Sequence, residues 1–303
     1  MTEDRHGVRP GGRFAPSPTG PLHLGSLLAA VASYVDARSL DLAWQLRFDD
    51  LDAPRNQPGA EDRIMRSLER HGLHWDGPVA RQSGRVDRYR AALEQLIADG
   101  RVFYCRCTRR MLAGQRRYPG TCRDQRQPAP GRAVRLQVTQ EAIAFEDAFV
   151  GKRSASLMDD VGDFVVWRRD GIPAYQLATA VDDGAEDIVR VVRGRDLLDN
   201  TPQQIWLMRL LGLFEPAYGH LPLLRDRAGR KLSKQNHAPA LDDRRPAANL
   251  ARVLAVLGVA LPADAASQDC PSLLAAAVAA WPPAALPWTD AVVETTAQGS
   301  QAS

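Results

Sequence analysis

The residues best suited to chemistry stand early in the chain, in the run Arg13–Ser26. A proline- and glycine-rich turn there separates a short strand, expected at 13–15, from a helix expected over 23–38. Free backbone N–H groups and the positive end of the helix dipole favour phosphate at the first turn of such a helix. A histidine in that turn can donate to a phosphate oxygen, and a glycine lets a nucleotide approach the backbone. The candidate ATP-binding residues are His23, Gly25 and Ser26.

A second motif, Lys231-Leu-Ser-Lys-Gln235, follows much later in a glycine- and arginine-rich stretch. Two lysines on a loop can gather the β- and γ-phosphates of ATP and neutralise charge that develops at the α-phosphate. Alone, so short a motif is typical of a solvated loop. Combined with the earlier histidine run, it predicts an ATP site that also uses Lys231, Ser233 and Lys234.

In this order, the two motifs resemble the His-Ile-Gly-His and Lys-Met-Ser-Lys-Ser signatures of the class I aminoacyl-tRNA synthetases. Ser26 stands in place of the second histidine, and the lysine motif has Leu232 for Met and Gln235 for the final Ser. The resemblance implies an α/β fold of Rossmann type with a doubly wound parallel sheet. It also implies attack of an amino-acid carboxylate on the α-phosphate of Mg²⁺-bound ATP, with His23 and Lys234 as catalytic residues.

Flanking segments narrow the resemblance to the glutamyl branch of these enzymes. They are Arg13–Ser17, Leu46–Asp52, Tyr175–Asp183 and Val192–Pro202. The resemblance implies an L-glutamate pocket made by Arg13, Phe14, Ala15, Pro16, Ser17, Asp49, Tyr175 and Arg193. The residue types agree, because Arg13 or Arg193 could hold the side-chain carboxylate in a bidentate fork and Asp49 could pair with the α-ammonium group. Asp49 is one methylene shorter than the glutamate that the family usually has there.

Three of the four cysteines, Cys105, Cys107 and Cys122, lie within 18 residues. Three thiolates can supply most of a tetrahedral zinc site, and in a chain of this length the pattern favours a metal over a disulfide framework. The segment contains no histidine, so the fourth ligand is open: Asp124 and water are candidates. Resemblance to the short glutamyl-queuosine tRNA(Asp) synthetases implies Tyr118 and one structural Zn²⁺. Three reduced surface cysteines are the alternative interpretation.

The stretch after Gln235 is short and rich in Ala and Leu, whereas a discriminating glutamyl-tRNA synthetase continues into a large helical anticodon-binding region. The chain therefore resembles the short glutamyl-queuosine branch. That resemblance implies glutamate activation without tRNA and transfer to the queuosine base of tRNA(Asp), with ATP, L-glutamate and tRNA(Asp) as partners. One alternative is a minimal enzyme that charges the 3′ end of tRNA(Glu). Another is a non-catalytic tRNA-binding module, against which the presence of both His23 and Lys234 argues.

The bulk composition is that of an ordinary globular protein, with 45% hydrophobic and 25% charged residues among 303. A net charge of +3 is too small to indicate nucleic-acid binding by itself. The arginine-rich stretch 106–126 could contact phosphate, but a solvated face is the favoured interpretation. We find no apolar run of about 20 residues and no export signal, so we expect a cytoplasmic protein without a membrane segment. No apolar stripe suggests an obligate dimer, so we expect a monomer.

Elsewhere the pattern alternates strands and helices up to residue 106 and is mostly β over 133–169. Strands are expected at 175–181 and 188–192, a helix at 201–211, and two or three small helices after Pro246. The expected domains are the first catalytic half (1–100), a zinc-containing insertion (101–174), the second catalytic half with the lysine loop (175–240) and a short helical C-terminal region (241–303).

Overall fold

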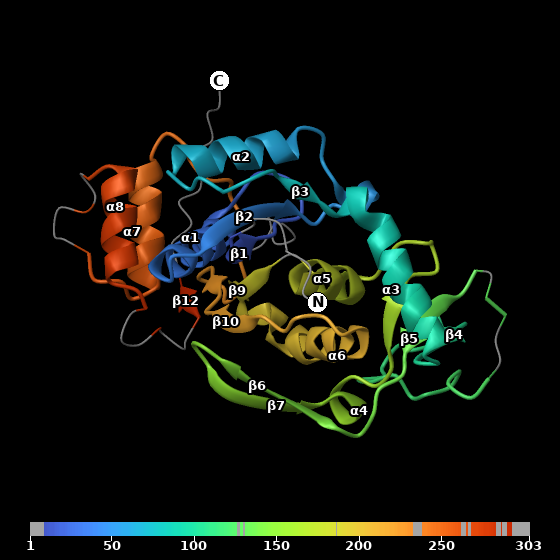
Figure 1. Ribbon diagram of the computed structural model, residues 1–303. Coiled ribbons are helices and arrows are strands. Elements are labelled where there is room, and N and C mark those ends of the chain that lie inside the picture. The colour runs from blue at the N-terminus through green and yellow to red at the C-terminus, as the bar shows by residue number, and fades with distance from the viewer. Residues whose placement is uncertain are drawn as a thin grey trace. The chain divides into compact units, whose positions relative to one another are not determined.

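The computed structural model describes residues 9–125, 128–129, 131–185, 187–232, 238–261, 265, 268–282, 286 and 290–292 (Figure 1). The chain folds into two compact units. The first unit combines residues 1–80, 190–196 and 219–303, and the second combines 81–189 and 197–218. The predicted division into four domains stays a prediction.

A sheet forms the centre of the first unit. Its strands follow the order β3-β2-β1-β9-β10, which is part of the seven-stranded sheet β3-β2-β1-β9-β10-β6-β7. Strands β1 and β2 pair in parallel, from Gly11 opposite Ala43 to Phe14 opposite Leu46, and helix α1 connects them. Parallel neighbours require such a crossover, which leaves the start of α1 at the end of β1. The strands are β1 Gly11–Phe14, β2 Ala43–Phe48, β3 Ala80–Arg81, β9 Ile188–Gly194 and β10 Ala217–Leu221.

The α-helices described in the first unit cover its core. Helix α1 buries Leu27, Val31 and Val35 completely, as its apolar periodicity predicts. Helices α7 and α8 pack against α1 and against each other, which confirms the expected small helices after Pro246. The helices are α1 Leu24–Ser39, α2 Ala60–Arg70, α7 Pro246–Val256 and α8 Cys270–Ala279, with the 3₁₀ turn η1 Ala53–Arg55 and short strands β11 Leu224–Arg225 and β12 Ala291–Val292.

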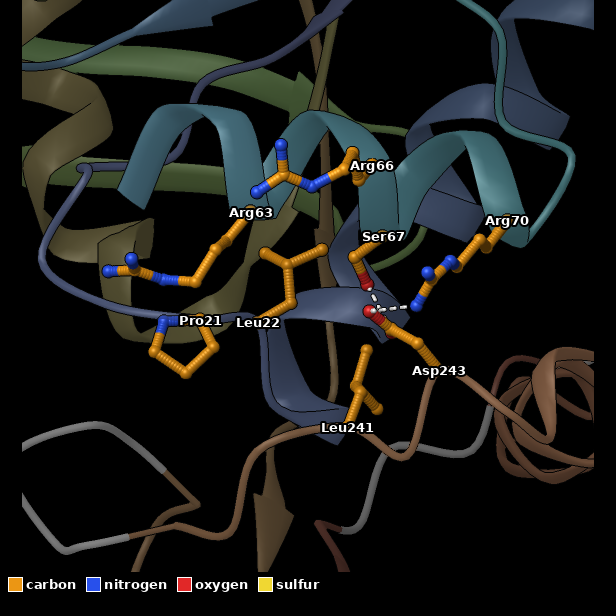
Figure 2. Close-up of a pocket in the computed structure, with 8 residues that line it drawn as sticks. All are labelled: Pro21, Leu22, Arg63, Arg66, Ser67, Arg70, Leu241 and Asp243. Carbon is orange, nitrogen blue, oxygen red and sulfur yellow. Dashed lines mark hydrogen bonds and ion pairs between the residues drawn. The ribbon is translucent and has the colours of Figure 1, made fainter. Parts of the chain in front are cut away.

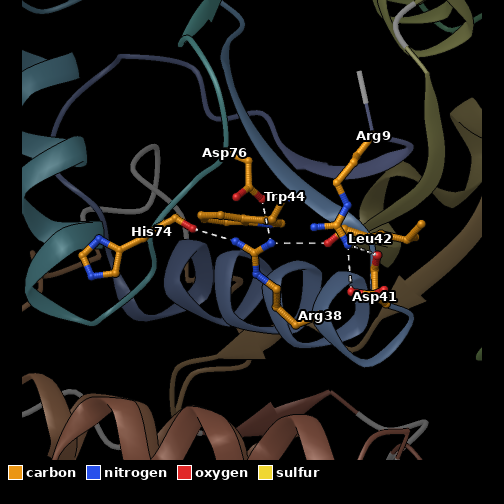
Figure 3. A network of polar contacts seen from close by, with 7 residues as sticks. All are labelled: Arg9, Arg38, Asp41, Leu42, Trp44, His74 and Asp76. Carbon is orange, nitrogen blue, oxygen red and sulfur yellow. Dashed lines mark hydrogen bonds and ion pairs between the residues drawn. The ribbon is translucent and has the colours of Figure 1, made fainter. Parts of the chain in front are cut away.

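A polar network joins the end of α1 to the start of β2 in the first unit (Figure 3). Arg38 donates to a carboxylate oxygen of Asp76 at 2.6 Å and to the carbonyl oxygen of His74 at 3.1 Å. The same Asp76 oxygen accepts the backbone N–H of Trp44 at 2.8 Å. Burial raises the pKa of Asp76, but the bonds from Arg38 and Trp44 outweigh it, so the pKa is lowered. We interpret this network as structural.

The second unit contains a three-stranded antiparallel sheet and a long hairpin. The sheet has the order β4-β5-β8, and the hairpin pairs β6 with β7. Tyr218 at the start of β10 pairs in parallel with Asp147 of β6. The strands are β4 Val102–Cys105, β5 Ala133–Leu136, β6 Ala142–Asp147, β7 Gly151–Ser156 and β8 Phe164–Trp167. The helices are α3 Val86–Ala98, α4 Leu157–Asp160, α5 Tyr175–Ala185 and α6 Thr201–Leu211, with 3₁₀ turns η2 Gln82–Arg85 and η3 Arg195–Asn200.

One predicted element is wrong: residues 175–181 form the first part of helix α5 and not a strand. The helix packs against α3 and α6, which bury Leu177 and Ala180 completely and Val181 almost completely. Asp182 is also buried, because it accepts hydrogen bonds from Gln82 at 2.9 Å and Tyr89 at 2.8 Å. The buried residues run without interruption from Leu177 to Gly184 and include two aspartates, so residue polarity along this segment does not mark which side of the helix is exposed.

The α/β class is confirmed by the parallel pairs β1–β2 and β10–β6 and by the helix that connects β1 to β2. Over the part of the chain that the structure describes, no helix combines the length and apolar character needed to cross a bilayer.

Candidate active site and cysteine cluster

His23 is the N-cap of α1, so the predicted phosphate-binding histidine lies at the helix start. Its Nδ1 accepts the backbone N–H of Ser26 at 3.2 Å. In the neutral ring, Nε2 is therefore the nitrogen that carries the proton and can donate. The Ser26 hydroxyl accepts the His23 backbone N–H at 2.8 Å and donates to the His23 carbonyl oxygen at 2.7 Å. Ser26 thus completes a capping box with the histidine.

Gly25 packs directly against the backbone of Leu232, the second residue of the lysine motif. A Cβ at this position would lie 3.0 Å from the carbonyl oxygen of Leu232 and 3.1 Å from the His23 ring. Ala240, beyond the motif, forms an isolated antiparallel bridge with His23 itself. The histidine and lysine motifs are therefore neighbours within the first unit, although they are distant in sequence.

Lys231 lies at the end of a tight turn that begins in β11. Its ammonium group contacts a carboxylate oxygen of Asp196 at 2.6 Å, and both side chains are about one-third exposed. Because the pair is partly solvated, it contributes little stability and can yield the lysine to a phosphate. Ser233, Lys234 and Gln235 lie outside the described residues.

Two arginines predicted to bind glutamate are buried in the first unit. Arg13 on β1 is 5% exposed, and Arg193 on β9 is 4% exposed. The Nε–H of Arg193 donates to Nε2 of His220 at 3.2 Å, which fixes the orientation of the guanidinium group. Buried guanidinium groups favour anionic ligands such as a carboxylate.

Asp49 is held beside the strand end that carries Arg13. Its backbone N–H donates to the carbonyl oxygen of Pro16 at 3.1 Å. Its carboxylate accepts Nε–H of Arg47 at 2.9 Å. The Arg47 side chain is 3% exposed and the Asp49 side chain is 10% exposed. The ring of Phe14 stacks on Trp44 at a centroid distance of 6.3 Å, so Phe14 supports the strand from the core.

The remaining predicted pocket residues differ in exposure. Ala15 and Pro16 are half-buried, and Ser17 is exposed. Tyr175 belongs to the second unit, where it starts α5 with a side chain 37% exposed. The structure thus gathers Arg13–Ser17, Asp49 and Arg193 in one unit.

Three residues that contact predicted ligand-binding side chains were not predicted from the sequence. Arg47 contacts Asp49, His220 contacts Arg193, and Asp196 contacts Lys231. Arg47 and Asp196 stand inside segments that were singled out, so their charge next to the predicted ligands was the available signal. His220 carried no signal, because it meets Arg193 only through the pairing of distant strands.

The three clustered cysteines converge in the second unit. Their sulfur atoms all lie within 4.8 Å of one another, and the Sγ atoms of Cys107 and Cys122 are 3.7 Å apart. Cys105 and Cys122 are buried and Cys107 is half-buried. This arrangement could hold a metal ion.

Tyr118 and Arg135 complete the surroundings of the cysteine cluster. The Tyr118 hydroxyl oxygen accepts the Cys105 thiol at 3.5 Å and the Cys122 backbone N–H at 2.8 Å. Arg135 donates Nε–H to the Cys105 sulfur at 3.2 Å, and its guanidinium carbon lies 3.9 Å from the centre of the Tyr118 ring. Arg135 therefore contacts the cluster through one sulfur and through the face of the tyrosine ring.

The surroundings of the cluster lower the pKa of one thiol and raise that of another. Burial raises the pKa of the Cys122 thiol, but hydrogen bonds from Arg106, Tyr118 and the other cysteines outweigh it and lower the pKa to about 7. Burial, followed by the neighbouring cysteines, raises the pKa of Cys107 to about 11. The pKa of Tyr118 is also raised, first by burial and then by its bond with Cys105.

Comparison with known proteins agrees with the site. The profile of the family "tRNA synthetases class I (E and Q), catalytic domain" matches residues 11–251. A glutamyl-Q tRNA(Asp) synthetase of Pseudomonas aeruginosa (strain PAO1) is 46% identical over 277 residues, covering 91% of this chain and 94% of the relative. A protein with the same name from Synechococcus sp. is 49% identical over 286 residues, covering 91% and 95%.

Among solved structures, a glutamate tRNA ligase from Elizabethkingia meningosepticum, in complex with its amino acid, superposes with a TM-score of 0.73 at 26% identity. The match covers 87% of this chain and 63% of the solved chain, so the present chain spans less than two-thirds of that ligase. The extent of the profile match and the identity to the named synthetases establish that this chain belongs to the class I tRNA synthetases of the E and Q type and is a ligase.

Proposed function

We propose that the protein activates L-glutamate with Mg²⁺-bound ATP in the absence of RNA and transfers the glutamyl group to the queuosine base of tRNA(Asp). The observation that carries this proposal is the meeting of the two motifs at Gly25 and Leu232, with Asp49 and two buried arginines in the same unit. The relatives that share most of their length with this chain bear the corresponding name.

In the proposed reaction, a glutamate α-carboxylate oxygen attacks the α-phosphorus of ATP and pyrophosphate leaves with the bond electrons. His23 donates from Nε2 to a phosphate oxygen, while Gly25 and Ser26 shape the helix end that faces the nucleotide. Lys231, Ser233 and Lys234 bind the β- and γ-phosphates of ATP, and Mg²⁺ bound with the nucleotide would offset part of their negative charge.

Glutamate recognition rests on charge. Arg13 or Arg193 binds the side-chain carboxylate, and His220 keeps Arg193 in place. Asp49 binds the α-ammonium group from the position that Arg47 sets. We assign Phe14, Ala15, Pro16 and Ser17 to the walls of the same pocket.

We also propose that the cysteine cluster binds one structural Zn²⁺ with Tyr118 as the fourth ligand. Tetrahedral zinc with Zn–S bonds of about 2.3 Å places its sulfurs about 3.8 Å apart, close to the 3.7 Å between Cys107 and Cys122. An oxygen ligand at about 2.0 Å would lie about 3.5 Å from a sulfur, as the Tyr118 hydroxyl does from Cys105. Asp124 is exposed and is absent from the converging ligand atoms among the described residues.

Labelled glutamate and three RNAs test the transfer step. The RNAs are native tRNA(Asp) with queuosine, tRNA(Asp) without it, and tRNA(Glu). We expect label only on the first, with no label for Lys234→Ala although that variant still binds RNA. Label on the 3′ end of tRNA(Glu), independent of queuosine, would replace the proposal by a minimal glutamyl-tRNA synthetase. RNA binding with no label on any RNA would favour the non-catalytic module.

A further inference from the structure

We propose that helix α2 carries a site for the backbone phosphates of the RNA substrate, in a pocket of about 190 Å³ beside the histidine motif (Figure 2). The identity of the partner as RNA rests on the proposed function. Three arginines, Arg63, Arg66 and Arg70, line the pocket together with Leu22 and Asp243. The inference concerns where RNA is held and leaves the chemistry of glutamate activation unchanged.

The three arginines share one side of α2. Their spacing of three and then four residues places them along one side of a helix, while Ile64 and Leu68 face the core and are fully buried. A rise of 1.5 Å per residue separates the first and last Cα atoms by about 10 Å. Figure 2 shows the three side chains leaving α2 along its length, beside Leu22. A row of this length suits a chain of phosphates better than a single anion.

The charges of the pocket do not cancel. Asp243 is its one acidic lining residue among those the structure describes, and it accepts a hydrogen bond from Ser67 at 2.7 Å. The same carboxylate lies 3.7 Å from Arg70, in a pair that is partly exposed. Among the described residues, Arg63 donates to the neutral carbonyl oxygen of Pro58, at 3.1 Å, and to no carboxylate.

Arg66 is exposed and, within the described part of the chain, has no hydrogen-bond or ion-pair partner. The pocket therefore carries three guanidinium groups against one carboxylate, which is an excess of positive charge that suits phosphodiesters. Guanidinium forks bind phosphate oxygens in pairs, and backbone phosphates account for most of the affinity of nucleic-acid complexes.

The pocket lies beside the segment that carries His23, so a phosphate bound there would hold RNA near the proposed active site. Leu22, which lines it, precedes His23, and the backbone N–H of Leu241 donates to the Leu22 carbonyl oxygen at 2.9 Å. The wall of the pocket is thus continuous with the backbone that positions the catalytic histidine. A phosphate held by α2 would therefore position RNA against the same segment that positions the glutamyl-adenylate.

The test compares the affinity of the full-length chain for native queuosine-containing tRNA(Asp) over a series of NaCl concentrations. We expect Arg66→Gln to weaken binding about fivefold near 0.1 M salt and to reduce the slope of log K against log[salt] by about 0.7 to 1. Arg66→Lys keeps the charge and should keep the slope. Arg90→Gln is the matched control, because that exposed arginine is already paired with Asp87 at 2.8 Å.

Glutamate-dependent ATP–pyrophosphate exchange without RNA separates this site from the adenylate site. We expect Arg66→Gln to exchange within twofold of the unsubstituted protein. If Arg66→Gln binds RNA with unchanged affinity and slope, the site is refuted while the proposed function stands. A raised KM for ATP in that variant would refute it too, because the pocket would then serve the nucleotide. If the unsubstituted protein exchanges but transfers no glutamate, the proposed function fails on its own account.

Discussion

His23 and Ser26 close the start of α1 through four hydrogen bonds, two of which use the Ser26 hydroxyl. The residue that replaces the second histidine of the family signature therefore holds the first histidine. The bond to Nδ1 comes from the Ser26 backbone, so the proton of the neutral ring stays on Nε2. The helix end and the histidine are positioned by one structural device.

Replacing the Ser26 hydroxyl should therefore affect both stability and activation. We expect Ser26→Ala to lose about 1 kcal/mol of unfolding free energy and to slow ATP–pyrophosphate exchange several-fold. Ser39→Ala is the control, because its hydroxyl makes one local bond, to the Asp36 carbonyl oxygen, at the other end of α1. Equal exchange rates for the two variants would show that the capping box does not position His23.

The buried pair of Arg47 and Asp49 should matter far more than an exposed pair nearby. We expect Arg47→Gln to cost about 3 kcal/mol of stability and to raise the KM for glutamate, because the carboxylate proposed to bind the α-ammonium group loses its fixed position. Arg55→Gln removes a largely exposed pair with Asp52 and should cost below about 1 kcal/mol. Urea unfolding measures the change in stability, and the kinetics of ATP–pyrophosphate exchange measure the KM for glutamate. An unchanged KM for Arg47→Gln would contradict the assigned role of Asp49.

Metal content tests the cysteine cluster. We expect about one equivalent of zinc per chain in the purified protein, lost in Cys105→Ser together with a lower melting temperature. Cys270→Ser is the control, since Cys270 is also buried but belongs to α8 and not to the cluster. Full melting temperature and full activity in a chelated, metal-free preparation would remove the structural zinc.

Stability should fall on mild acidification because of His71. This buried ring faces the Ser67 carbonyl oxygen at Nδ1 (2.6 Å) and the Asn249 amide nitrogen at Nε2 (3.1 Å), which fits only a neutral ring that donates from Nδ1. Burial is the main cause that lowers its pKa below 6.5. The unfolded chain therefore binds the proton first, so stability is complete above about pH 6.5 and is lost as pH falls.

Urea unfolding at pH 7.5 and 5.5 measures this effect. We expect the unfolding free energy to decline by at most about 1.4 kcal/mol per pH unit from this group. His71→Gln should flatten the decline, whereas substitution of the exposed His74 by Gln should retain it. An identical decline in His71→Gln would assign the acid sensitivity to other groups.

The parts of the fold that the sequence predicted are those with local signals. The helix at 23–38, the strand before it and the cysteine cluster all follow from periodicity or spacing. Helix α5 was missed, because its buried residues include two aspartates, so polar residues do not mark an exposed side. Its Asp182 finds Tyr89 and Gln82 more than 90 residues away, and no pattern along the chain reveals such a partner.

Some contacts of the candidate site could likewise be predicted from the sequence, and others appear only in the folded chain. Arg47 stands two residues from Asp49, so its role was within reach of the sequence, while the meeting of Arg193 with His220 depends on how two strands align. The contact of Gly25 with Leu232 is similar, since only the folded chain shows why that glycine has no room for a side chain.

Glutamate-dependent ATP–pyrophosphate exchange by the full-length protein, with Mg²⁺ and no RNA, tests the central claim most directly. Strong exchange that Lys234→Ala abolishes is the predicted result, because activation is proposed to need only ATP, glutamate and the two motifs. Exchange that begins only when tRNA(Glu) is added would contradict the account and favour a minimal glutamyl-tRNA synthetase.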